Sequence, residues 1–139
     1  MNWSYLSCGL ALCVILGQQV GCGYGPSGPV RYEVTGTVTY NGEPVPYGEI
    51  TFAPDGAKGN QGPGAVVTIS NGTYQVGREH GVIGGPHIVT ITGYTAAPDS
   101  GAVSDIPTPQ PKQLFAPYSE NADLPTDNTI KDFKVPGRT

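Results

Sequence analysis

The chain has 139 residues, and glycine (21) and proline (14) together make up about a quarter of them. Charged residues are only 13%, about half of the usual share of roughly 25%, which excludes helical bundles and coiled coils. The net charge is −4 and the seven basic residues are scattered, whereas binding to nucleic acid needs a clustered basic surface. The composition fits a turn-rich β domain or a partly disordered linker, and no nucleic-acid partner is expected.

The first thirty residues differ from the rest of the chain, because every Asp, Glu, Lys and Arg lies at or after Arg31. Within them, residues 6–16 (LSCGLALCVIL) form an uninterrupted apolar stretch. A membrane-spanning helix needs about 20 such residues, so this stretch is too short to be one. Its length is typical of the hydrophobic region of a secretory signal, and the sequence therefore predicts export.

The apolar stretch leads through Gly21 into Cys22. A small residue before a cysteine, just after an apolar run, resembles the signal of bacterial lipoproteins. The resemblance implies that a signal peptide of residues 1–21 is removed and that Cys22 is diacylated on its sulfur. A secreted protein without lipid and an uncleaved anchor remain as alternatives.

The use of cysteine supports the lipid anchor. Cys8 and Cys13 lie in the signal, so Cys22 is the only cysteine of the mature chain and an internal disulfide is impossible. In many Gram-negative bacteria an Asp after the lipidated cysteine signals retention in the inner membrane; here the residue is Gly23, so the outer membrane is expected. Residues 22–31 contain a literal G-x-G-x-x-G interrupted by prolines, and we interpret them as a tether rather than as a nucleotide site.

From Tyr32 onward, apolar residues recur with a period of two, as in strands with one buried face. Asn41-Gly42 and Asn71-Gly72 are turn signals that accept positive φ. No segment has the pattern of an amphipathic helix. The expected strands are 32–40, 48–52, 65–70, 73–76, 87–92 and 129–135, and the expected loops are 56–64, 77–86 and the proline-rich segment 94–113, the last expected to be mobile and not a strand pair.

Six or seven strands in about a hundred residues, with turn signals every 8 to 12 residues, predict an all-β fold of the β-sandwich type. A sandwich of this size needs an apolar core rather than a disulfide. The residues expected to form that core are Val34, Val38, Ile50, Phe52, Val67, Ile69, Tyr74, Val89, Ile91 and Phe133.

Several segments resemble a carboxypeptidase regulatory-like domain: 34–45, 48–54, the Ile69-x-x-Gly72-x-Tyr74 step, 81–91 and Pro117-Tyr118. The resemblance covers about 32–135, within a domain assigned to 32–139. It implies a transthyretin-like, Greek-key β-sandwich of about seven strands, as found in small bacterial lipoproteins that are generally non-catalytic. In such a domain Gly36 and Gly72 would allow the backbone geometry of a strand and of a turn. The shared motifs do not indicate any ligand.

Two clusters contain side chains that metal ions bind. His80 and His87, with Glu79 beside the first, are too few for zinc, which takes three or four ligands, so we interpret them as a turn residue and a strand-entry residue. Residues 121–128 hold four oxygen-bearing side chains without the spacing of a calcium loop, and we favour a solvated turn. The four are Asn121, Asp123, Asp127 and Asn128. No metal and no cofactor are expected.

Catalytic residues are not expected either. No serine lies in a G-x-S-x-G motif, and no thiol remains free after lipidation. Aromatic side chains flank several turns, where an exposed ring stacks on a sugar or peptide and a buried one packs a corner. These residues are Tyr40, Tyr47, Tyr94 and Tyr118.

The sequence therefore predicts a non-catalytic envelope lipoprotein whose β domain is a structural or interaction module. Its partners would be the membrane, through the lipid on Cys22, and an envelope protein or glycan. The alternative is a carbohydrate- or calcium-binding module that uses the 94–113 loop or the acidic cluster. Clustered exposed tyrosines would favour ligand binding, and a free edge strand would favour binding of a protein segment.

Overall fold

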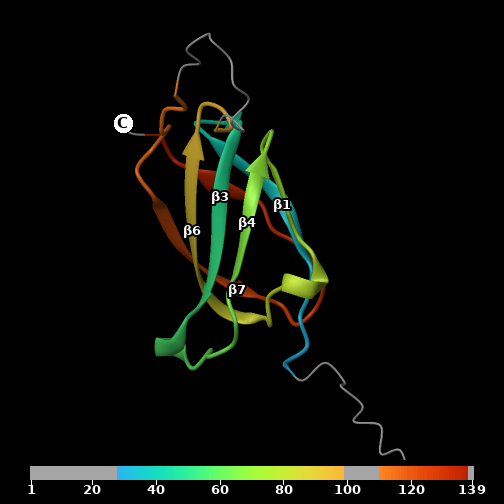
Figure 1. Cartoon of the computed structure of the whole chain (residues 1–139). Helices are drawn as coiled ribbons and strands as arrows, with labels where there is room; N and C mark the ends of the chain where they lie inside the picture. The colour runs from blue at the N-terminus through green and yellow to red at the C-terminus, as the bar shows by residue number, and fades with distance from the viewer. Residues whose placement is uncertain (1–27, 99–109, 138–139) are drawn as a thin grey trace, which may run out of the picture.

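The computed structural model describes residues 28–98 and 110–137 (Figure 1). The expected signal peptide and Cys22 lie outside these residues. Two short 3-10 helices, η1 (Gly56–Lys58) and η2 (Arg78–His80), accompany the strands. The strands are β1 (Val34–Tyr40), β2 (Glu43–Pro44), β3 (Tyr47–Pro54), β4 (Ala65–Ser70), β5 (Thr73–Val76), β6 (Gly85–Tyr94), β7 (Tyr118–Leu124), β8 (Thr129–Ile130) and β9 (Phe133–Val135).

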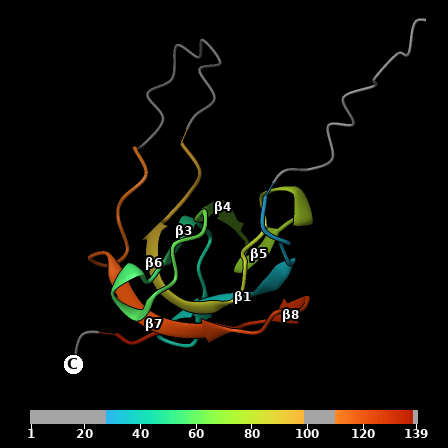
Figure 2. The same ribbon diagram turned by 90° about the horizontal axis from the view of Figure 1, so that it is seen from below.

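The strands form one curled sheet in the order β2-β1-β5-β4-β3-β6-β7. Neighbours on this path are antiparallel, whereas β8 and β9 pair in parallel with β1. Because the sheet curls, β7 and β8 lie on the same side of the molecule (Figure 2). The predicted all-β class and the number of about seven strands are confirmed. The continuous pairing is consistent with a β-sandwich.

The two predicted Asn-Gly turns have the conformation that their residues favour. Asn41 and Gly42 have φ of 53° and 84°, and Asn71 and Gly72 have φ of 49° and 74°. Asparagine and glycine accept such left-handed angles at low cost, and two of them in succession match the twist of a hairpin. The first turn joins β1 to β2 and the second joins β4 to β5.

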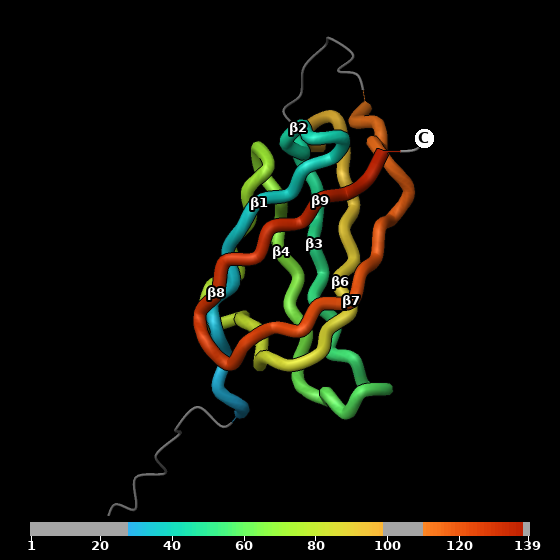
Figure 3. The backbone as a smooth tube through the Cα atoms, turned by 180° about the vertical axis from the view of Figure 1, so that it is seen from behind, coloured from blue at the N-terminus to red at the C-terminus, as the bar shows by residue number. Residues whose placement is uncertain are grey.

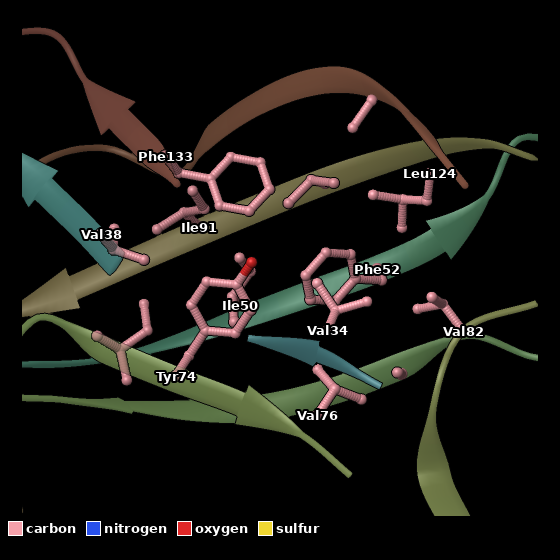
Figure 4. Close-up of a cluster of buried hydrophobic side chains, with 14 of the residues drawn as sticks. Val34, Val38, Ile50, Phe52, Tyr74, Val76, Val82, Ile91, Leu124 and Phe133 are labelled. Atoms are coloured by element: carbon pink, nitrogen blue, oxygen red, sulfur yellow. The ribbon is translucent and has the colours of Figure 1, made fainter. Parts of the chain in front are cut away.

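The core lies inside the curl, where inward side chains of the strands meet (Figure 4). All of the predicted core residues are buried except Val67, which is half-buried and packs against the others. The rings of Phe52, Tyr74 and Phe133 contact one another at centroid distances of 5.9 to 6.1 Å. Tertiary structure adds further buried residues that the pattern did not single out: Val45, Ala65, Val76, Val82, Ala122, Leu124 and Val135.

The predicted last strand, 129–135, is divided into β8 and β9 by Lys131 and Asp132. The Lys131 carbonyl accepts a hydrogen bond of 2.6 Å from the Tyr74 hydroxyl. Only glycine fits at position 36, because a Cβ there would collide with that carbonyl. Between β8 and β9 the side chain of Asp132 bonds to β1 in place of the backbone. Its Oδ1 accepts hydrogen bonds of 2.8 Å from the amide and the hydroxyl of Thr37.

The loop expected at 56–64 is more ordered than its composition indicated. Buried Asp55 accepts a hydrogen bond from the amide of Ala57 and caps η1. Buried Asn60 donates its Nδ2 to the carbonyls of Gly84 and Pro86, at 3.1 and 2.8 Å. The two bonds of Asn60 join the loop to Gly84 and to Pro86 at the start of β6.

Two further expectations are wrong in part. The turn expected at 121–128 is confined to the residues after Leu124, because 118–124 form β7: the sequence YSENADL places polar residues on the exposed face and Ala122 and Leu124 on the buried one. The proline-rich segment is also paired at its described ends: the Thr95 amide donates to the Lys112 carbonyl at 2.9 Å, and Tyr94 pairs with Gln113. The prolines at 107 and 109 lie outside the described residues.

Candidate functional site

A groove of about 420 Å³ opens at the end of the sheet where β1 and β9 finish and the chain enters β7. Its walls are mainly aromatic and apolar, and half-buried side chains form part of them. The lining residues are Tyr40, Gln113, Leu114, Phe115, Ala116, Pro117, Tyr118, Val135 and Pro136. We call this feature the aromatic groove.

Backbone pairing places the two walls of the aromatic groove. Tyr40 is opposite Val135 in the β1–β9 ladder, and the Leu114 amide donates to the Gly93 carbonyl at 2.8 Å. A Cβ at Gly93 would lie 2.6 Å from the Phe115 ring, so this glycine makes room for the aromatic side chain. Phe115 then packs against Tyr40, with ring centroids 4.9 Å apart and planes inclined by 37°.

The β7 wall carries a polar pair. The Tyr118 hydroxyl donates a hydrogen bond of 3.0 Å to Oε2 of Glu120, two residues along the same face of the strand. This bond to a carboxylate raises the pKa of Tyr118 above its usual range. The groove therefore has an acid next to its aromatic wall.

Two free strand edges flank the groove. Within the described residues, β7 pairs only with β6, and β9 pairs only with β1. Figure 3 shows β7 and β9 as separate traces whose ends lie near each other at the end of the domain where the groove lies. An edge strand presents backbone N–H and C=O groups without a neighbouring strand. The site thus combines an aromatic surface with unused main-chain hydrogen-bonding capacity.

The structure brings together two of the four tyrosines that the sequence singled out. Tyr40 and Tyr118 line the groove, whereas Tyr47 and Tyr94 are opposite each other in the β3–β6 ladder. Tyr47 lies on the outer face of the sheet, because its neighbour Gly48 is buried. Sequence reasoning missed Phe115, which lies between the proline-rich segment and an unpredicted strand.

The two histidines have different environments. His80 is exposed in η2, whereas His87 is 1% exposed and points into the core. Its Nδ1 lies 2.8 Å from the Gly85 carbonyl oxygen and its buried Nε2 has no hydrogen-bond partner. His87 thus lies near the start of a strand, as expected, but it is the third residue of β6 and is buried. No group of three metal-binding side chains occurs in residues 28–98 and 110–137.

The oxygen-bearing cluster is not gathered around one point. Asn121 and Asp123 are exposed in β7, whereas Asp127 and Asn128 belong to the following turn. In that turn Asn128 accepts from the Glu33 amide at 3.0 Å, and its own amide donates to Asp127 at 2.7 Å. The side-chain oxygens of this turn thus accept hydrogen bonds from nearby backbone amides.

The aromatic groove lies far from the point where the N-terminal segment enters the domain. β1 runs from Val34, near that entry, to Tyr40 at the groove (Figure 1). Seven residues at about 3.3 Å each place these ends roughly 20 Å apart. None of the helices in the described part of the chain has the length and apolarity to cross a membrane.

Comparison with protein-family models, with curated proteins and with solved structures finds no match to this chain. Its functional interpretation therefore depends on the geometry of the aromatic groove and on the sequence signals outside the described residues.

Proposed function

We propose that this chain is a non-catalytic envelope lipoprotein that binds a partner through the aromatic groove. The lipid on Cys22 would hold the mature protein at the membrane, preferentially the outer one, with residues 22–31 as a tether. The β domain would be a carboxypeptidase regulatory-like sandwich. The observation that carries the proposal is the gathering of Tyr40, Phe115 and Tyr118 around one groove.

The position of the groove supports this function. A domain tethered through its N-terminal segment has its entry point nearest to the membrane. The groove lies at the other end of β1, and its aromatic surface would therefore face away from the lipid (Figure 1). That orientation suits a module that meets another envelope component.

The chemistry of the groove favours binding over catalysis. Its walls supply aromatic, aliphatic and proline side chains, and the only ionisable groups among the lining residues are two tyrosines. Catalysis usually depends on acids, bases or nucleophiles with perturbed pKa held in one concave site. A glycan remains the alternative occupant, because sugars also stack on exposed aromatic rings. The placement of Asn121, Asp123, Asp127 and Asn128 does not favour calcium.

The anchor is tested by Cys22→Ala in the full chain. The variant should lose labelling by a fatty-acid probe and leave the membrane fraction, whereas a Cys8→Ala control should remain labelled and membrane-bound. A Cys22→Ala protein that is still labelled and still sediments with membranes would contradict the anchor.

The groove is tested by chemical cross-linking of intact envelopes. Tyr118→Ala should remove the adducts that the wild-type protein forms, because it deletes one aromatic wall of the groove. The matched control is Tyr47→Ala, which removes a tyrosine from a different face. Equal loss of adducts in both variants, or in neither, would count against the groove as the binding surface.

A further inference from the structure

The free edge of β7 gives the aromatic groove a more specific use. β7 has seven residues and, within the described part of the chain, hydrogen-bonds only to β6. Its first residue, Tyr118, lines the groove. A strand added beside β7 would lie about 4.8 Å away and place alternate side chains toward the interior of the curl. One of those side chains would enter the groove.

An extended peptide uses both features of this site. Its main chain can pair with the free edge, while its side chains contact the aromatic wall. A sugar would stack on a ring and hydrogen-bond to side chains but would leave the free edge of β7 unused, and Tyr40 and Phe115 already partly cover each other at a centroid distance of 4.9 Å. Main-chain pairing therefore favours a peptide over a glycan.

Charge indicates which peptide fits. β7 (YSENADL) contains Glu120 and Asp123 and no basic residue. Glu120 is held beside the groove by the hydrogen bond from Tyr118. A second copy of β7 would bring two further acids and no basic residue beside Glu120 and Asp123, and like charges repel. A lysine or arginine on the added strand would instead complement Glu120.

Resting on the proposed function, we infer that the partner contributes an extended segment that adds as a strand to the free edge of β7. An apolar side chain of this segment occupies the aromatic groove, and a lysine or arginine two positions away pairs with Glu120. The segment has no proline at its centre, because its amides donate to β7.

The test uses the full chain in detergent micelles and selects binders from a displayed library of random ten-residue peptides. The expected binders carry an apolar residue two positions away from a Lys or Arg. A synthetic copy should lose at least tenfold in affinity when its alternate amides are N-methylated. Glu120→Gln should weaken binding severalfold and Tyr118→Ala at least tenfold, whereas Glu49→Gln on the outer face of β3 should leave it unchanged.

The other outcomes separate this inference from the proposed function. Binders that require Tyr118 but tolerate N-methylation, including proline-rich ones, would overturn strand addition and leave the groove as the binding surface. Failure to select any peptide, with a glycan array showing binding that Tyr118→Ala abolishes, would overturn the peptide and keep the groove. Absence of both peptide and glycan binding would overturn the inference and the function together.

Discussion

The hydroxyl of Tyr74 stabilises the interrupted strand pair at the C-terminal end of the sheet, and Tyr74→Phe should measure that contribution. The substitution keeps the ring among Phe52 and Phe133 but removes the 2.6 Å hydrogen bond to the Lys131 carbonyl. A hydrogen bond contributes about 1 kcal/mol net, and leaving the part-buried Lys131 carbonyl unpaired adds to that cost. We therefore expect Tyr74→Phe to lower the free energy of unfolding by about 1–2 kcal/mol.

The dependence of stability on alkaline pH is a second measure of the contribution of Tyr74. Burial, and to a lesser extent the nearby Asp132 charge, raises the pKa of Tyr74 above its usual value of 10.0. Above pH 10 the unfolded chain releases this proton and the folded chain keeps it, so stability falls as pH rises. Tyr74→Phe should show a shallower decline than the wild type between pH 10 and 11.

Both readouts come from urea unfolding followed by circular dichroism on the full chain in detergent micelles. Tyr47→Phe is the control, because its hydroxyl lies on the outer face of the sheet. An unchanged midpoint for Tyr74→Phe, or a pH slope equal to that of the control, would refute the assigned role of the hydroxyl.

Two further predictions concern the same region. Gly36→Ala should cost about 2–3 kcal/mol or prevent folding, because the added methyl group collides with the Lys131 carbonyl, whereas Gly56→Ala, with open space around it, should change the urea midpoint little. Hydrogen bonds from Thr37 lower the pKa of Asp132 in the folded protein below 3.8, its ordinary value. These bonds therefore stabilise the fold fully above pH 3.8, and the stabilisation is lost as the pH falls through the pKa of the folded state. Asp132→Asn should therefore flatten the acid limb of a stability–pH profile between pH 4 and 2, and a profile unchanged from the wild type would contradict this.

The sequence predicted the strands wherever local signals were strong. The hairpin 65–76 has alternating residues on both sides of Asn71-Gly72, and its two strands have the predicted bounds. Buried positions followed from the same alternation, because a period of two places every second residue on one face. The all-β class therefore needed no tertiary information.

What the sequence could not predict depends on contacts between distant segments. β7 has few β-branched residues, and Asn121 and Asp123 indicated a turn; it is a strand because it pairs with the strongly β-forming β6. The aromatic groove joins Tyr40 with Phe115 and Tyr118, which are more than seventy positions away along the chain. Two of these residues stood out as aromatics beside turns, but only the curl of the sheet brings them together.

The proposed function requires that a partner of this protein contacts the aromatic groove. Site-specific photo-cross-linking in living cells tests it most directly, with a photoreactive amino acid at Ala116, an exposed lining residue of the groove. The control position is Ala57, which is exposed in η1 at the opposite end of the domain (Figure 1). We expect a discrete adduct from position 116 that Tyr118→Ala abolishes, and no adduct from position 57. An adduct from position 57 alone, or one from position 116 that persists in Tyr118→Ala, would contradict it.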